Sequence, residues 1–109
     1  MEEWQPTFTY HGFRFVELTG FREKPSLSDF EGQVIYDEME TTGNLETSDP
    51  MINRIYKNAY WGIRGNYRGM PTDCPQRDER MGWLGDRAVG SQGESYIFNN
   101  HLLYAKWLD

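Results

Sequence analysis

Acidic, basic and aromatic side chains are concentrated in one short segment, residues 71–86. This segment holds four carboxylates, two arginines and a tryptophan. Its prolines and glycines interrupt any regular helix or strand, so the sequence predicts a loop. Loops held by a rigid scaffold often carry catalytic side chains. Carboxylates beside an aromatic surface and guanidinium groups suit the hydrolysis of a sugar acetal, so glycoside hydrolysis is the first hypothesis.

Glu79 is the candidate general acid of this segment. A general acid must carry a proton near the working pH, which burial or a neighbouring like charge favours. Trp83 could supply an apolar wall and Asp78 a like charge. Arg77 and Arg80 favour the ionised carboxylate instead. These influences oppose each other, so a structural ion pair is the alternative for Glu79.

The polar and aromatic residues around Glu79 are candidates for sugar binding. Asp73 and Asp86 could accept hydrogen bonds from vicinal hydroxyls and stabilise positive charge at an anomeric carbon. Each also precedes a segment in which a helix cap or an Asx-turn would be natural, and that local role is the alternative. Arg77 could hold a carboxylate through a bidentate fork or be a solvated charge. Trp83 could stack on a sugar face or fill a gap in the core.

Other kinds of site are not indicated by the sequence. His11 and His101 are far apart and have no nearby histidine or cysteine partner, so we expect no zinc site. The acids do not follow the calcium-loop pattern, and no phosphate-binding glycine motif is present. We therefore expect no metal and no cofactor. A lone cysteine such as Cys74 is more often a small buried residue than a nucleophile.

Composition narrows the class of protein. The chain has 109 residues, 38% of them hydrophobic and 16% aromatic, which is typical of one ordered domain rather than a disordered chain. Its formal net charge of −6 argues against nucleic acid or an anionic membrane as a partner. We find no long apolar run for a membrane span and no secretory signal at the N-terminus, and the sequence leaves localisation undetermined.

Two segments have the composition of β-strands. Aromatic and β-branched residues in 7–20 predict extended structure, and residues 33–37 predict a second strand. A loop over residues 21–31 separates them, so the two segments could pair. A strand pair is stable only when something covers its apolar face.

The pattern changes to that of helices after residue 40. Asp49 followed by Pro50 is a helix start, and apolar residues then recur at helical spacing until Gly62 and Gly65 make the end uncertain. A charged loop over about 66–88 and a second helix over about 92–108 complete the prediction. The expected fold is an α+β fragment, and its uncovered apolar helix faces could serve self-association.

Residues 73–86, with the sequence DCPQRDERMGWLGD, resemble the signature of bacterial α-L-rhamnosidases, glycoside hydrolase family 78. The resemblance extends over nearly the whole chain. Residues 8–16 resemble the end of the β-sandwich that precedes the catalytic domain of that family. Residues 53–66 and 96–108 resemble the first two helices of its catalytic barrel.

The resemblance implies a hydrolase with an (α/α)6 six-hairpin barrel that removes terminal α-L-rhamnose from rhamnose-containing glycosides with inversion of configuration. Glu79 would be the general acid, and the rhamnose pocket would be lined by Asp73, Arg77, Trp83 and Asp86. The general base of the family is a glutamate far downstream, which has no counterpart in this chain.

The expected organisation is therefore that of a fragment. Residues 1–40 would be the end of the β-sandwich or a linker, and residues 41–109 the first helices and acid-bearing loop of a partial barrel. A twelve-helix barrel needs roughly 200 residues, so only two of its helices fit. We expect the isolated chain to be inactive. The alternative is a truncated, non-catalytic domain that binds carbohydrate or self-associates.

Overall fold

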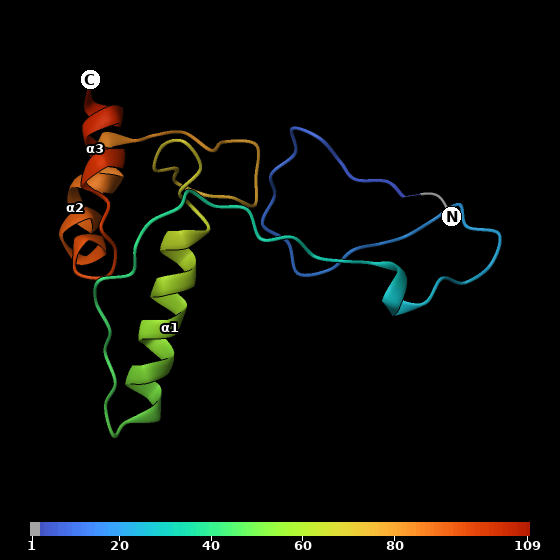
Figure 1. Cartoon of the computed structure of the whole chain (residues 1–109), viewed down its shortest axis with the longest axis horizontal. Coiled ribbons are helices and arrows are strands. Elements are labelled where there is room, and N and C mark those ends of the chain that lie inside the picture. The colour runs from blue at the N-terminus through green and yellow to red at the C-terminus, as the bar shows by residue number, and fades with distance from the viewer. Residues whose placement is uncertain (1–2) are drawn as a thin grey trace.

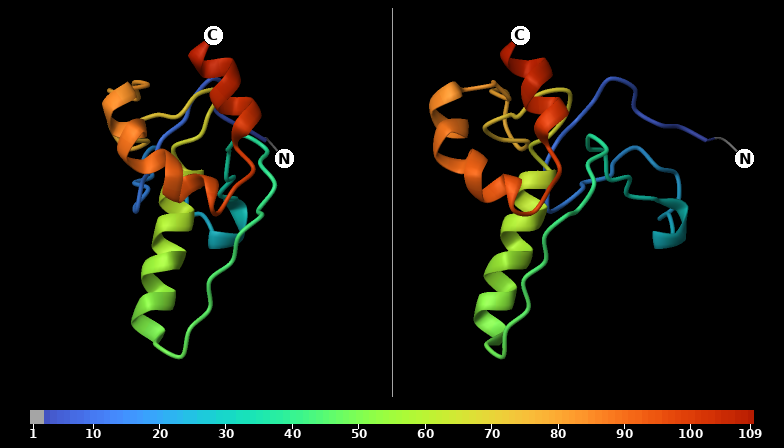
Figure 2. Two further views of the ribbon diagram at one scale, coloured as in Figure 1. Left: turned by 90° about the vertical axis from the view of Figure 1, so that its left-hand side faces the viewer. Right: turned by 60° about the vertical axis from the view of Figure 1, so that its left-hand side comes forward.

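The computed structural model describes residues 3–109, which form a short 3-10 helix and three α-helices (Figure 1). These are η1 (Leu27–Asp29), α1 (Pro50–Arg64), α2 (Leu84–Ser95) and α3 (His101–Leu108). The three α-helices gather at one end of the molecule, and most of residues 3–36, which include η1, form loops that extend away from them (Figures 1 and 2). None of the helices in the described range is long and apolar enough to cross a membrane.

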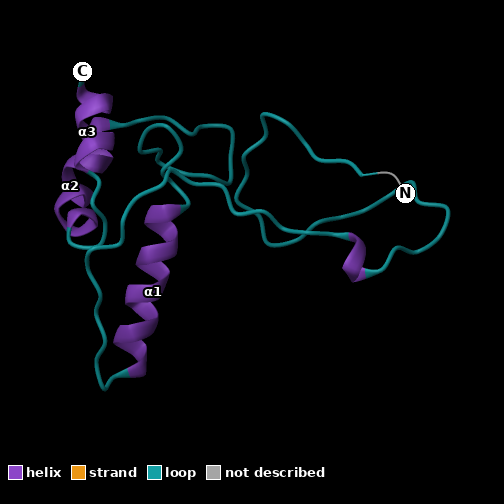
Figure 3. Cartoon of the chain, in the orientation of Figure 1, coloured by secondary structure: helices purple, strands orange, loops and turns teal. Residues whose placement is uncertain are grey.

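The predicted pair of strands is wrong. Across residues 3–109 the structure contains helices and loops but no strand (Figure 3), and its β-type contacts are two isolated bridges. A strand forms only where a neighbour takes up its backbone hydrogen bonds. Residues 33–37 instead reach the helical region, where the Asp37 amide donates to the Tyr67 carbonyl at 2.9 Å. The α+β expectation is thus corrected to a mostly helical segment of a six-hairpin fold.

Helix α1 begins where the sequence predicted. The Asp49 carboxylate accepts a hydrogen bond from the Met51 amide at 2.8 Å, and Pro50 occupies the first helical turn. The helix continues through Gly62 and is capped by Gly65. Local capping chemistry therefore accounts for the start of α1, whereas Gly65 at its end keeps an ordinary right-handed backbone.

The single helix predicted over 92–108 is wrong, because the chain forms two helices there. Helix α2 begins at Leu84, which shortens the predicted loop, and the chain turns at residues 96–100 before α3. Ile97 and Phe98 lie in this turn and are only 8% and 1% exposed. Their amides donate to the Glu94 carbonyl at 3.0 and 2.9 Å. Burial of these two apolar side chains thus interrupts an otherwise helical pattern.

A small core lies where the C-terminal end of α1 meets residues 67–74 and the turn between α2 and α3. Large apolar side chains remain exposed on all three helices, so the expectation of uncovered helix faces is confirmed, and self-association stays a prediction. The buried side chains include Tyr67, Pro71, Thr72, Cys74, Glu94, Ile97, Phe98 and Asn100.

A buried carboxylate joins three parts of this core. Glu94, 5% exposed, accepts hydrogen bonds from the Tyr67 hydroxyl and, at 2.8 Å, from the Tyr104 hydroxyl. Arg87 pairs with the same carboxylate at 2.7 Å and balances its charge. Burial, together with hydrogen bonding to Glu94, raises the pKa of Tyr67 well above its ordinary value and that of Tyr104 to about 12.

Gly43 marks a very close backbone approach. The amides of Thr42 and Gly43 donate to the Ile97 carbonyl at 2.9 and 3.1 Å. A Cβ atom at Gly43 would lie 1.7 Å from the Tyr96 carbonyl oxygen, which no side chain can tolerate. The segment before α1 can therefore pack on the turn between α2 and α3 only with glycine at this position.

We expect Gly43→Ala to lower the free energy of unfolding by about 1 to 3 kcal/mol, because the segment must move off the turn. Gly62→Ala is the matched control: its Cβ would meet no atom within 4 Å, and alanine in a helix should raise stability by up to about 1 kcal/mol. Urea unfolding measures both variants. Similar stability changes in the two would contradict the close approach at Gly43.

We expect alkaline pH to weaken the fold through Tyr104. Its raised pKa means that the folded chain favours the neutral hydroxyl, so its contribution is complete below the ordinary value of 10.0 and is lost as pH rises through about 12. Thermal unfolding across this range is compared with that of Tyr104→Phe, which has no hydroxyl to titrate. The variant should lose stability less steeply, and parallel curves would overturn the assignment.

Candidate functional site

Residues 73–83 form an acid-bearing loop that Asp73 closes. The Asp73 amide donates to the Met81 carbonyl at 3.0 Å, and the Met81 amide donates to Asp73 Oδ1 at 2.7 Å. The Asp73 side chain is 5% exposed. Asp73 therefore forms the floor of the loop and brings its two ends together.

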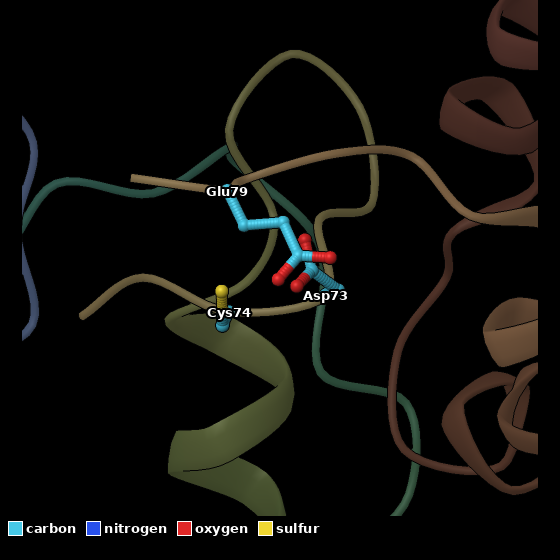
Figure 4. Close-up of side chains that lie close together, drawn as sticks. All are labelled: Asp73, Cys74 and Glu79. Carbon is cyan, nitrogen blue, oxygen red and sulfur yellow. The ribbon is translucent and has the colours of Figure 1, made fainter. Parts of the chain in front are cut away.

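Four of the five predicted site residues meet within this loop. Arg77 Nη2 lies 2.7 Å from Glu79 Oε2 and 3.4 Å from Asp73 Oδ2. Trp83 Nε1 donates to Glu79 Oε1 at 3.0 Å. Figure 4 shows the carboxylates of Asp73 and Glu79 side by side, with Cys74 close to them. The two oxygens of Glu79 thus have different partners, a guanidinium and an indole.

The cluster opens to solvent above Asp73. The side chains of Glu79 and Arg77 are 37% and 61% exposed, and Trp83 is 50% exposed. A cavity of about 720 Å³ lies between the N-terminal segment and the end of α1, and its lining residues include Pro75 of the acid-bearing loop but not Glu79. Glu79 is therefore ion-paired but accessible, on a surface that this chain does not enclose.

Hydrogen bonding keeps the floor of the loop charged. The Cys74 thiol, the Met81 amide and the Arg77 guanidinium donate to the Asp73 carboxylate and hold its pKa below the ordinary value. The neighbouring side chains of Cys74 and Glu79 raise the pKa of Arg77 still further above its high ordinary value. Asp73 and Arg77 are consequently a fixed anion and a fixed cation.

Asp73, Cys74 and Glu79 also have donor atoms of the kind that hold a metal ion, all within 4.8 Å of one another. Arg77 already bonds both carboxylates of this group. A metal ion would have to displace that guanidinium, and the charge-assisted hydrogen bonds between Arg77 and the two carboxylates would be lost. The side chains therefore fit arginine better than a metal, and we assign no metal chemistry to them.

Asp86 lies apart from the other predicted residues. It is exposed in the first turn of α2, where a negative charge is favourable near a helix N-terminus. Within the described residues, no hydrogen bond joins its side chain to the cluster. Asp86 lies inside α2 rather than before it, and the helix has no side-chain cap hydrogen bond, so the structure does not show the cap or Asx-turn that the sequence offered as its local role.

Sequence reasoning missed the part played by Arg80. Its Nη1 donates to the Tyr10 carbonyl at 2.6 Å and lies 3.0 Å from His11 Nδ1, and its Nη2 lies 2.9 Å from Asp78. The backbone of Arg80 is left-handed, with φ of 44°. Arginine has no preference for that conformation, and Tyr10 is 70 positions away, so no local pattern could indicate either feature.

Comparison with known proteins agrees with the resemblance seen in the sequence. Residues 40–109 match the model described as bacterial alpha-L-rhamnosidase 6 hairpin glycosidase domain, and residues 1–36 the model described as bacterial alpha-L-rhamnosidase concanavalin-like domain. An alpha-L-rhamnosidase of Streptomyces avermitilis is 44% identical over 107 residues, which is 98% of this chain and 10% of that protein.

Two solved structures have the same backbone arrangement. The alpha-L-rhamnosidase from Dictyoglumus thermophilum superimposes with a TM-score of 0.94 at 45% identity, over 98% of this chain and 12% of that one. The Streptomyces avermitilis alpha-L-rhamnosidase complexed with L-rhamnose superimposes with a TM-score of 0.91 at 44% identity, over 96% and 10%.

The chain spans about a tenth of the length of these relatives. The six-hairpin model nevertheless matches residues 40–109, well over half of the chain, and the likeness to the solved structures covers nearly all of it. This chain therefore belongs to the bacterial alpha-L-rhamnosidase family.

Proposed function

We propose that this chain forms the acid-bearing part of an alpha-L-rhamnosidase active site. Glu79 protonates the glycosidic oxygen as its bond to the anomeric carbon breaks. A water activated by a base outside this chain attacks the anomeric carbon from the opposite face, with inversion. Terminal α-L-rhamnose of a rhamnose-containing glycoside occupies a pocket lined by Asp73, Arg77, Trp83 and Asp86. The meeting of Glu79 with Arg77 and Trp83, at 2.7 and 3.0 Å, carries this proposal.

Arg77 determines whether Glu79 Oε2 is accessible. Its guanidinium lies 2.7 Å from that oxygen, so a glycosidic oxygen can reach Oε2 only after the ion pair opens. Arg77 has a second acceptor in Asp73 Oδ2, at 3.4 Å, and the lowered pKa of Asp73 keeps that acceptor charged. Sugar hydroxyls that draw Arg77 toward Asp73 would uncover Glu79 Oε2.

Trp83 and Asp86 can face the same sugar. The indole N–H of Trp83 is engaged by Glu79, while the ring is half exposed and free to pack on a sugar face. Trp83 is the N-cap of α2, and Asp86 follows it by three positions. Both residues therefore lie at the start of α2, and in the proposed pocket they contact one rhamnose from there.

Asp73 is poorly suited to be the base of an inverting reaction. One oxygen of Asp73 lies within 4.8 Å of one oxygen of Glu79, whereas inverting pairs keep their carboxyl groups roughly 6.5 to 9.5 Å apart to leave room for a water. Asp73 is also buried, and both of its oxygens are hydrogen-bonded within the loop. These observations support a base that lies outside this chain.

The proposal includes a division of the chain near residue 40. Residues 1–40 would belong to the end of a β-sandwich and residues 41–109 to the start of the catalytic barrel. The two family models, which cover residues 1–36 and 40–109, support this division. The acid-bearing loop then lies wholly on the barrel side.

The 109-residue chain alone should give no turnover of an aryl α-L-rhamnoside, because the proposed base is absent. Calorimetric titration with L-rhamnose on the same sample separates a carbohydrate-binding role from no role at all. Sedimentation of that sample tests the other alternative, since the exposed apolar helix faces favour self-association. Measurable turnover by the isolated chain would contradict the proposal.

A graft tests Glu79 directly. This chain replaces the matching segment of the Streptomyces avermitilis enzyme, which its backbone superimposes on with a TM-score of 0.91. In the graft, Glu79→Gln should lower kcat/KM by about 10² to 10⁴-fold on a glycoside with a poor leaving group. An activated aryl rhamnoside needs less protonation, so its hydrolysis should fall much less.

Asp78→Asn is the matched control for this experiment. Asp78 is adjacent to Glu79 in the same loop, but its side chain is 97% exposed and pairs with Arg80, so activity should be kept on both substrates. Equal losses on the two substrates in Glu79→Gln would show that Glu79 is not the proton donor.

A further inference from the structure

We infer that Arg80 is a positioning residue, which ties residues 10–12 to the acid-bearing loop and thereby sets the direction of Glu79. The inference deepens the proposed function, and its catalytic meaning rests on that function. The contact between Arg80 and residues 10–12 determines how the loop is held, and this role can be tested without measuring activity.

Residues 10–12 contact the loop at two points. Arg80 Nη1 donates to the Tyr10 carbonyl at 2.6 Å and lies 3.0 Å from His11 Nδ1. The Gly12 amide donates to the Pro75 carbonyl at 2.7 Å, and a Cβ atom at Gly12 would lie 3.0 Å from Pro75 Cγ. The N-terminal segment therefore holds the loop both near its beginning and immediately after Glu79.

The backbone at Arg80 is strained and needs a restraint. A left-handed conformation with φ of 44° is unfavourable for an arginine, and it persists only where surrounding contacts hold it. The Arg80 side chain is 25% exposed and supplies such contacts through its guanidinium. Without them, Arg80 would relax to an ordinary φ.

That relaxation would move Glu79 rather than the rest of the loop. Met81, on the other side of Arg80, is anchored to Asp73 by two hydrogen bonds of 2.7 and 3.0 Å. Rotation about the backbone of Arg80 therefore turns the Glu79 side of the chain, and the contacts of Glu79 with Arg77 and Trp83 would be lost.

The ion pair between Arg80 and Asp78 is a weaker restraint. It joins residues two positions apart, and the Asp78 side chain is 97% exposed, so solvent screens it. His11 can accept from Arg80 only when Nδ1 carries no proton, whereas the Tyr10 carbonyl accepts in every state. The bond to the Tyr10 carbonyl is thus the constant restraint, with His11 beside it.

The indole N–H of Trp83 provides the readout, because it donates to Glu79 Oε1. Its resonance is assigned with Trp83→Phe in proton–nitrogen correlation spectra of the full chain. We measure how far Glu79→Gln shifts this signal, first in the otherwise unchanged chain and then with Arg80→Met or Arg80→Gly. A clear shift is expected in the first case, and most of it should be lost in both Arg80 variants.

Glycine separates the restraint from the strain. Arg80→Gly accepts φ of 44° without cost but has no guanidinium. A full response in this variant, meaning an undiminished shift of the Trp83 signal on Glu79→Gln, would overturn the inference. Asp78→Asn is the matched control and should keep the response. A loss in Asp78→Asn as large as in Arg80→Met would place the restraint within the loop, which also overturns the inference.

Helical circular dichroism checks that each variant is folded. If Arg80→Met unfolds, the combination of His11→Ala with Gly12→Ala decides the matter, because it disturbs residues 10–12 and leaves the loop sequence intact. This combination should reduce the response, and an unchanged response would overturn the inference. The two proposals can fail separately. If Glu79→Gln does not lower activity in the graft, but the shift of the Trp83 signal still depends on Arg80, only the proposed function is rejected.

Discussion

The buried charge of Glu94 is the constraint on which the helical region and the acid-bearing loop depend. Glu94 belongs to α2, and its carboxylate binds Tyr67 before the loop and Tyr104 in α3. The loop begins six residues after Tyr67 and ends at the N-cap of α2. The segments on both sides of the loop are therefore held in place by one carboxylate. Arg87 balances its charge, so the penalty of burial is offset.

A second, local constraint shapes the loop between these ends. The two backbone contacts of Asp73 with Met81 close it into a ring, and Arg77 spans the ring from Asp73 to Glu79. Each acid then has a distinct environment: Asp73 is buried and saturated with donors, whereas Glu79 keeps partial exposure. Two carboxylates six residues apart are in this way prepared for different roles.

Features determined by near neighbours could be predicted from the sequence. The start of α1 follows from Asp49 and Pro50, and the cluster of Asp73, Arg77, Glu79 and Trp83 lies within a single loop whose composition indicated a site. Features determined by distant contacts could not. The break between α2 and α3 depends on the burial of Phe98 in a core built from other segments.

The failed strand prediction has the same physical origin. Residues 7–20 and 33–37 have strand-like composition, but a ladder requires a partner at the right distance and register. Within the described range their backbone groups bond instead to residues such as Tyr67 and Pro75. Composition can indicate an extended backbone, whereas pairing is a property of the assembled fold.

The contacts that orient Glu79 are present within the part of the chain that the structure describes, whereas partners for the exposed helix faces are not. Its partners and the restraint at Arg80 lie within residues 10–83, including a contact between the regions matched by the two family models. The exposed apolar faces of the three helices, by contrast, have no partner of comparable size within the described chain. The direction of Glu79 is therefore established by contacts within residues 10–83, and one of them joins positions far apart in the sequence. In the proposed function, the sugar is enclosed and the base supplied by residues outside this chain, so the two halves of such a site can be perturbed separately.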